Sequence, residues 1–290
     1  MRISYWPNSV AINAKSVYDA LLSSLNSAGY ILEKENINSD AAVIWSVLWN
    51  GRMLPNLRVW NHYRDCKKPV LVAEVGAIKR GETWRIGLNG INRSAYFGTV
   101  NNSNHRALQI DLNAKPWKTD GDYILICGQH TQSLQWKNMP TMSQWLMTII
   151  EQIQLHSKRD IVFRPHPRCR LPDIELQYQR VYRQEPRLLP DTYDDFDLSL
   201  HNVHAVVNWS SNPGIDATIN GVAAFVGPDS LAFDVANHDL CSIDSPQYNC
   251  RSQWINDLAW KEFTVEEIAQ GLPLNRLRQA LDSEIVNAMI

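Results

Sequence analysis

Short apolar runs alternate with amphipathic stretches along the chain, and this alternation predicts an α/β protein. Residues 1–6 (MRISYW) are expected to form a first strand, and residues 13–29 then place apolar side chains at helical spacing. Residues 41–49 and 68–76 are apolar, β-branched runs typical of buried parallel strands, with a helix expected between them after Pro55. The chain therefore begins with strand–helix–strand units.

A polar stretch after Asn113 separates this region from a second series of apolar runs. Strands are expected at 123–129, 160–167, 203–211 and 222–227, and helices at 143–157 and 214–220. We therefore expect an N-terminal domain at 1–118, a second domain at 119–262 and a helical tail at 263–290. Both domains would be doubly wound and Rossmann-like, with ligands outside the carboxyl ends of their strands.

The composition narrows the class of protein. The N-terminal segment lacks the apolar core of a signal peptide, and no apolar run approaches the roughly 18 residues of a membrane span. Five cysteines occur without a CxxC pair, which argues against a disulfide framework or a structural zinc site. We expect a cytoplasmic protein without a membrane span.

The net charge of −2 conceals an uneven distribution. Residues 1–187 contain 24 basic and 15 acidic residues, whereas 188–290 contain 4 and 15. Basic residues concentrate at 52–93 and at 158–187. Each stretch could be a solvated helix face, or the two together could line an anion-binding cleft.

The segment RPHPRCR (164–170) directly follows an expected strand. Its two prolines fix the backbone on either side of His166, and Arg164 and Arg168 supply forked hydrogen-bond donors nearby. This combination suits a diphosphate or a departing phosphate. A surface turn whose charges face water is the alternative.

The segment NWSSNPGID (208–216) joins an expected strand to an expected helix. Ser210 and Ser211 together with backbone N–H groups would form an anion site at the helix N-terminus, and Asp216 could accept hydrogen bonds from a ribose. Ordinary N-capping by serine is the alternative.

The segment AEVGAIKRG (73–81) places Glu74 at the end of an expected strand. Partial burial there would raise the pKa of Glu74 toward that of a general base, whereas an ion pair with Lys79 or Arg80 is the structural alternative. Trp84 and Asn89 follow in the next segment, and Trp84 could stack on a sugar or a base.

Metal and cofactor motifs are weak. Two Asp-x-Asp triplets occur, at 120–122 and 195–197, but one lies in a linker-like stretch and the other precedes a helix, where acids act as caps. No paired-histidine, P-loop or GxGxxG motif is present. We therefore expect neither a metal nor a cofactor.

Five segments taken in order resemble the capsular-polysaccharide Kdo-transferase-like glycosyltransferase family and its phage-encoded branch. They are AEVGAIKRG…GLNG (73–90), CGQHTQSLQW (127–136), RPHPR (164–168), SSNPGIDATINGVAAFVGP (210–228) and QWINDLAWKEFTVEEIAQG (253–271). The resemblance implies a GT-B fold of two facing Rossmann-like domains, with the acceptor on the N-terminal side and a nucleotide-sugar on the other. It also implies catalysis without a metal.

The resemblance also assigns residues. The family's histidine and paired serines, which contact the donor phosphates, match His166, Ser210 and Ser211, and its glutamine-to-serine stretch matches Gln129 and Ser133. Relatives with an acidic pair would place the base where Val75 stands, so Glu74 is the remaining acid for that role. The expected donor-binding residues are Gly128, Gln129, Ser133, Arg164, His166, Arg168, Ser210, Ser211 and Asp216. The expected acceptor-side residues are Lys79, Arg80, Trp84 and Asn89, and the expected catalytic residues are Glu74 and His166.

These observations predict an inverting, metal-independent glycosyltransferase with a nucleotide-sugar as co-substrate. The resemblance to the phage branch and the basic stretch at 52–93 favour DNA as acceptor, with a sugar, arabinose being one candidate, transferred to 5-hydroxymethylcytosine. A capsule or surface-glycan glycosyltransferase, a phosphotransferase and a non-catalytic nucleotide-binding module remain alternatives.

Overall fold

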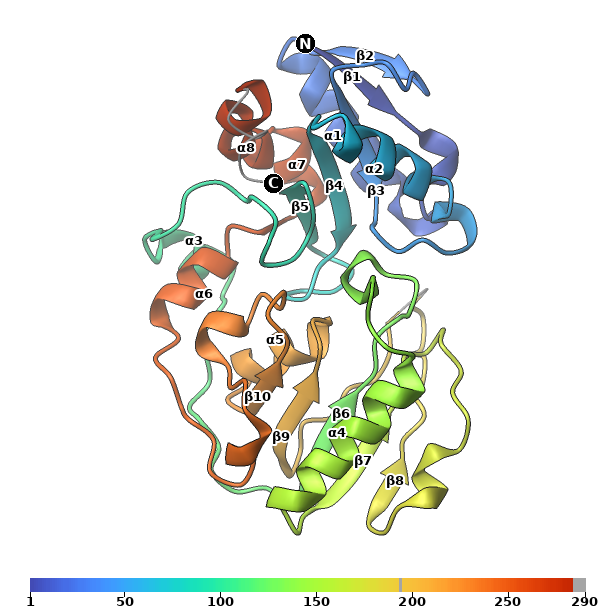
Figure 1. Ribbon diagram of the computed structural model, residues 1–290. Helices are drawn as coiled ribbons and strands as arrows, with labels where there is room; N and C mark the ends of the chain where they lie inside the picture. The colour runs from blue at the N-terminus through green and yellow to red at the C-terminus, as the bar shows by residue number, and fades with distance from the viewer. Residues whose placement is uncertain (193–194, 284–290) are drawn as a thin grey trace. The chain divides into compact units, whose positions relative to one another are not determined.

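The computed structural model describes residues 1–192 and 195–283. These residues form two compact units, each built around its own β-sheet (Figure 1). The first unit combines Met1–Arg106 with the described part of Asn256–Ile290, and the second unit is Ala107–Ile255. Within the described ranges, no helix is both long and apolar enough to cross a membrane.

A six-stranded sheet in the order β11-β5-β4-β3-β1-β2 forms the centre of the first unit. Its strands are β1 (Arg2–Tyr5), β2 (Ile31–Lys34), β3 (Ala41–Trp45), β4 (Val70–Val75), β5 (Trp84–Leu88) and β11 (Glu262–Phe263). Strands β1 to β4 run parallel to one another, whereas β5 is antiparallel to β4 and β11 is antiparallel to β5.

Helices cover this sheet through apolar side chains at helical spacing. They are α1 (Lys15–Ser27), α2 (Asn56–Asp65), α7 (Val265–Ala269) and α8 (Leu272–Asp282), while the short α3 (His105–Gln109) and α6 (Ser252–Leu258) span the two unit boundaries. Val17 and Leu21 of α1 share one buried core with Val43 and Leu71 of the sheet. Burial of these side chains is the main favourable contribution to the fold.

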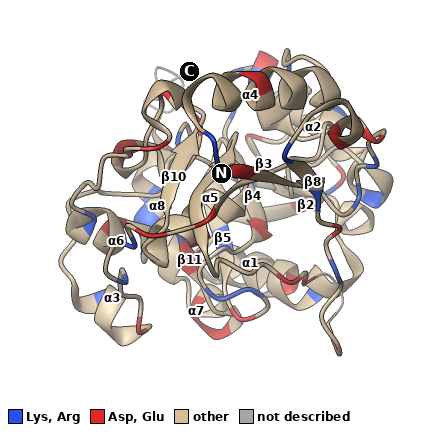
Figure 2. Ribbon diagram, turned by 90° about the horizontal axis from the view of Figure 1, so that it is seen from below, with Lys and Arg blue, Asp and Glu red and all other residues tan. Residues whose placement is uncertain are grey.

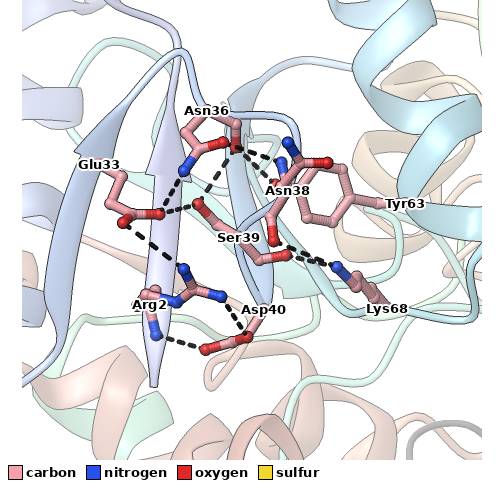
Figure 3. A network of polar contacts seen from close by, with 8 residues as sticks. All are labelled: Arg2, Glu33, Asn36, Asn38, Ser39, Asp40, Tyr63 and Lys68. Atoms are coloured by element: carbon pink, nitrogen blue, oxygen red, sulfur yellow. Dashed lines mark hydrogen bonds and ion pairs between the residues drawn. The ribbon is translucent and has the colours of Figure 1, made fainter.

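A polar network fixes the connection between β2 and β3 (Figure 3). Arg2 binds Asp40 through both its backbone N–H and its guanidinium group, and Glu33 accepts hydrogen bonds from the side chains of Asn36 and Ser39. From outside the loop, Tyr63 donates to the Asn36 carbonyl and Lys68 donates to the Ser39 carbonyl. Only Ser39 of this connection is buried, and the hydrogen bonds join the loop to its own flanking strands and to Tyr63 and Lys68, so we assign this cluster a structural role.

The C-terminal segment packs on the first unit. Phe263, Ile268, Leu274 and Leu277 belong to the same core as α1, and α7 and α8 lie beside β4 and β5 in Figure 1. The compact units divide after Arg106 and after Ile255, and the sequence-based domain limits at 118 and 262 stay predictions. The segment expected as a helical tail contributes Phe263 of β11 and the helices α7 and α8 to the first unit.

The second unit contains a five-stranded, entirely parallel sheet in the order β10-β9-β6-β7-β8. Its strands are β6 (Tyr123–Cys127), β7 (Asp160–Arg164), β8 (Val181–Arg183), β9 (Val203–Asn208) and β10 (Ala223–Val226), and its main helices are α4 (Met142–His156) and α5 (Asn212–Ile219). From β6 the chain proceeds outward to β7 and β8, then returns to β9 beside β6 and proceeds to β10. The strand order therefore reverses between β6 and β9, which is where open α/β sheets bind ligands.

The predicted α/β class is confirmed, with two parallel-rich sheets, each in a compact unit of its own. The strand expected at 41–49 is shorter than predicted, because Ser46 adopts a left-handed conformation (φ 65°) and ends β3 at Trp45. The sequence pattern does not predict strands β2, β5 and β8. Strands β2 and β8 are only partly buried and carry charged side chains, and β5, although mostly buried, is interrupted by Arg85 and Gly87, so none of the three forms a continuous apolar run.

Candidate functional site

Two of the predicted donor-binding residues lie side by side where the strand order of the second sheet reverses, between β6 and β9. Gln129 follows β6 and Ser210 follows β9, and both side chains are buried. The Gln129 Oε1 atom accepts hydrogen bonds from both the backbone N–H and the hydroxyl of Ser210, each at 3.1 Å. On its other side, Gln129 Nε2 donates to the Ser133 hydroxyl at 3.0 Å. Residues far apart in sequence thus form one polar cluster at the carboxyl ends of β6 and β9.

Helix α5 begins directly after this cluster. Ser211 is its N-cap residue, yet the Ser211 hydroxyl accepts a hydrogen bond from Asn208 Nδ2 at 2.9 Å and does not cap the first turn. Gly214 is required in that turn, because a Cβ atom there would lie 2.4 Å from Asn208 Oδ1. The Gly214 N–H donates to the Ser211 carbonyl at 3.3 Å, and the positive end of the helix dipole lies at this end of α5, beside Ser210 and Ser211.

His166 stands on the neighbouring loop. Gly128 donates its N–H to the carbonyl of Arg164 at 2.8 Å, and a Cβ on Gly128 would come within 3.1 Å of the His166 nitrogen. The glycine therefore allows the RPHP loop to lie close to the end of β6. The backbone N–H of Arg168 donates to His166 Nδ1 at 3.2 Å, and Cys169 N–H donates to the His166 carbonyl.

A second histidine belongs to the same cluster, and the sequence motifs do not single it out. His130 is only 6% exposed, and its ring lies edge-on to that of His166, with centroids 5.1 Å apart. Its Nδ1 accepts the N–H of Gln132 at 3.1 Å. Burial, with a smaller contribution from Arg168, lowers the pKa of His130. In each histidine the Nδ1 atom accepts a backbone N–H, and an imidazole ring that accepts at Nδ1 carries its proton on Nε2.

Arg164 is held within the second unit by Asp197. Its Nη2 lies 3.1 Å from Asp197 Oδ1 and also donates to the Asp197 carbonyl. The N–H of Arg187, followed by the Arg164 guanidinium, holds the pKa of Asp197 below its usual range. Arg168 is exposed. In the described part of the chain, no three His, Cys, Asp or Glu side chains gather as a metal site would require.

Asp216 lies further along α5, and its carboxylate forms a hydrogen bond with a residue at the C-terminal end of the helix. Its carboxylate accepts from Asn220 Nδ2 at 2.9 Å, and Asn220 is the C-cap residue. Burial raises the pKa of Asp216. The Asp216 carboxylate also acts electrostatically on Cys127 at the end of β6, and its ribose-binding role remains a prediction.

Glu74 lies at the carboxyl end of β4 in the first unit. Ser46, at the end of the neighbouring strand β3, donates its hydroxyl to Glu74 Oε2 at 2.5 Å, and the N–H of Val75 donates to Oε1 at 2.9 Å. Burial raises the pKa of Glu74, against the opposing effects of these two donors and of the positive charges of Arg85 and Arg80. A carboxylate at a strand end with a raised pKa has the properties of a general base.

The four predicted acceptor-side residues do not all lie near Glu74. Lys79 is exposed and Arg80 partly buried on the loop after β4. Trp84 pairs with Val75, and both pack on the core, on the opposite face of the sheet from Glu74. Asn89 exchanges hydrogen bonds with Val70 at the beginning of β4, at the other end of the strand from Glu74.

The basic stretch at 52–93 is not a continuous surface feature. Arg85 is buried, Arg64 lies 5.7 Å from the ring of Trp60, and Lys68 binds the β2–β3 connection. Basic and acidic segments are interspersed along the ribbon in Figure 2. The basic residues of 52–93 therefore do not act as one cationic surface.

No protein-family model matches the chain, and no curated protein matches its sequence. A comparison with solved structures aligns it with two KpsC structures from Thermosulfurimonas dismutans. The beta Kdo 2,7 transferase is 13% identical, with 95% of this chain and 99% of that chain covered and a TM-score of 0.43. The beta Kdo 2,4 transferase is 9% identical, with 94% of this chain and 98% of that chain covered and a TM-score of 0.44. These alignments are too distant to assign chemistry, so the functional proposal rests on the residues of this chain.

Proposed function

We propose that this protein is a metal-independent glycosyltransferase whose second unit binds a nucleotide-sugar donor. The observation that carries the proposal is the Gln129–Ser210 link at the reversal point of the second sheet, directly before the N-terminus of α5, which has no side-chain cap. This is the position at which doubly wound sheets bind phosphorylated ligands.

The polar groups around this link match the needs of a departing nucleotide phosphate. The dipole of α5 and the Nε2–H groups of His166 and His130 would stabilise the phosphate oxygens as negative charge develops on them. Arg168 would add a positive charge from the same loop. Because all these groups come from the protein, the proposed leaving-group stabilisation needs no metal ion.

In the first unit, Glu74 would act as the general base of an inverting reaction. The acceptor hydroxyl oxygen would attack the anomeric carbon and lose its proton to Glu74, while the bond from that carbon to the donor phosphate breaks. The raised pKa of Glu74 and its position at a strand end support this role.

For the acceptor, we propose 5-hydroxymethylcytosine in duplex DNA. The loop after β4 carries Lys79 and Arg80 close in sequence to Glu74, which would let phosphate contacts deliver the hydroxyl to the base. The motif resemblance also favours a surface glycan as acceptor. A transfer assay that offers both acceptors distinguishes the two.

Donor binding can be tested without knowing the acceptor. Thermal shift and calorimetry with UDP, GDP, ADP, TDP and CMP, all in EDTA, should identify one nucleotide that stabilises the wild-type protein. Ser210→Ala should weaken that binding, whereas Ser245→Ala, an exposed serine of the same unit, should not. If no nucleotide binds the wild type, or if Ser210→Ala binds equally well, the proposed donor site is wrong.

A further inference from the structure

Glu262 is a fully buried carboxylate that the proposed reaction does not use. It lies in β11, in the C-terminal segment, and none of its side chain is exposed. Its Oε1 accepts from the N–H of Ala77 at 2.7 Å and from Arg85 Nη2 at 2.9 Å. Its Oε2 accepts from the N–H of Ile78 and the hydroxyl of Thr83, each at 3.0 Å. Four donors on one buried carboxylate form a specific anion-binding arrangement.

Three of these donors belong to the loop at 76–83, which connects Glu74 on β4 to β5. Gly76 is needed at the start of the loop, because a Cβ there would lie 2.3 Å from Glu262 Oε2 and 2.5 Å from the Thr83 carbonyl. Glu262 therefore holds both ends of the loop that begins two residues after Glu74. The same loop carries Lys79 and Arg80.

The fourth donor, Arg85, links Glu262 electrostatically to Glu74. Arg85 is directly opposite Glu74 in the β4–β5 register, so the two side chains leave the same face of the sheet. The groups acting on Glu74 are Arg85 from β5, Arg80 from the loop, the Ser46 hydroxyl from the end of β3 and the backbone N–H of Val75. Glu262 neutralises the first of these in a buried ion pair.

We propose that Glu262 is a positioning residue for Glu74, fixing the 76–83 loop through Ala77, Ile78 and Thr83 and offsetting the charge of Arg85. The proposal rests on the proposed function only in giving Glu74 a catalytic role. The loop anchoring and the charge compensation are properties of the folded chain and can be measured without any substrate.

Removing the charge of Glu262 should change how Glu74 ionises. In Glu262→Gln the Arg85 cation loses its counter-charge and favours the ionised form of Glu74, so the titration midpoint of Glu74 should fall by about one pH unit or more. In the double variant Arg85→Gln/Glu262→Gln both charges are absent, so the midpoint should rise above that of the wild type. The two variants therefore shift the midpoint in opposite directions.

The test is an NMR titration of the Glu74 side-chain carboxyl, combined with amide hydrogen exchange at Ala77 and Ile78. Glu266→Gln, an exposed glutamate on α7, is the matched control and should leave both readouts unchanged. Faster exchange at the two amides and a lowered midpoint in Glu262→Gln support the proposal. An unchanged midpoint in that folded variant overturns it, as does a midpoint in the double variant at or below the wild-type value.

The double variant also covers the case in which Glu262→Gln alone does not fold, because replacing both members of a buried ion pair is better tolerated than leaving one charge unpaired. If Glu74 is the base, the acid limb of the transfer-rate pH profile should move with its midpoint. The two roles can be separated. If the Glu74 midpoint moves in Glu262→Gln but Glu74→Gln transfers sugar at the wild-type rate, Glu262 positions Glu74 and Glu74 is not the general base.

Discussion

Glu74 ionises in surroundings that favour its neutral form. A carboxyl whose pKa is raised on folding contributes stability below its unfolded pKa, and this contribution is lost as the pH rises through the folded pKa. We therefore predict that Glu74→Gln raises the melting temperature relative to wild type at pH 8 and that this gain disappears at pH 4. Differential scanning calorimetry across this range checks it, and a variant equally or less stable than wild type at pH 8 would contradict the prediction.

His166 should matter for turnover and little for folding, because it is half-buried on a loop outside the core. Loss of one transition-state hydrogen-bond donor costs about 2.7–4 kcal/mol, so His166→Ala should lower kcat by roughly 10²–10³-fold. His201→Ala, an exposed histidine of the same unit, is the control. A purified His166→Ala protein with wild-type kcat would refute the phosphate role.

For single residues, the sequence predicts the site well only where it shows which strand a residue follows and in which direction that strand runs. Gln129 and Ser210 can be grouped because both follow strands expected to be parallel, and the fold brings them together. Asn89 is close to Glu74 in sequence, but β4 and β5 are antiparallel, which carries Asn89 to the opposite end of β4. His130 belongs to no motif of its own, and only the fold reveals its contact with His166.

At the scale of elements, strongly periodic segments are predictable and partner-dependent ones are not. Helix α4 has five buried apolar positions at helical spacing and a capping box at Thr141, so its sequence alone determines it. Strand β11 is two residues long and exists because Glu262 and Phe263 pair with Arg85 and Trp84, from a distant part of the chain. No local pattern could reveal that pairing.

The attachment of the C-terminal elements to the first unit depends on Arg106. This buried side chain forms two hydrogen bonds of 2.8 Å to the carboxylate of Glu267 and donates to the carbonyls of Ala259 and Glu262. Arg106→Ala should lower the free energy of unfolding by about 3–5 kcal/mol, since it leaves the Glu267 charge unpaired. Arg106→Lys should recover only part of this stability, because an ammonium group cannot form the paired contact.

Urea unfolding measures the effect of Arg106. Arg278→Ala, which removes a largely exposed ion pair with Asp282 on α8, should cost no more than about 1 kcal/mol. An Arg106→Ala variant as stable as Arg278→Ala would show that α7 and β11 are held mainly by their apolar side chains.

At the scale of the whole molecule, the charge difference between the two halves of the sequence is largely removed by the fold. The first unit contains 16 basic and 13 acidic residues and the second contains 12 and 17, because the acidic segment from 256 onward joins the basic N-terminal region and the basic segment 107–187 joins the acidic segment 188–255. Acidic residues of the segment from 256 onward form ion pairs with buried cations of the first unit: Glu262 pairs with Arg85, and Glu267 pairs with Arg106. Net charge alone therefore cannot identify the acceptor.

If DNA is the acceptor, local cations must bind its phosphates. We predict that Lys79→Glu/Arg80→Glu weakens duplex binding and reduces the slope of log K against log salt by about 0.9 for each phosphate that the loop no longer neutralises. Nucleotide binding should be unchanged, because the proposed donor site lies in the other unit. Fluorescence anisotropy at several salt concentrations measures the slope, and equal slopes for the two proteins would exclude phosphate binding by this loop.

The central claim is that the protein transfers a sugar from a nucleotide donor without a metal. The most direct measurement is mass spectrometry of acceptors incubated with a panel of nucleotide-sugars in excess EDTA, with duplex DNA containing 5-hydroxymethylcytosine, the same duplex unmodified, and a surface glycan. We predict a pentose or hexose on the modified base alone, together with released nucleotide. Labelling of the glycan instead would show that the acceptor is a glycan and not DNA. Activity that requires added Mg²⁺ or Mn²⁺, or no sugar transfer with any donor, would contradict it.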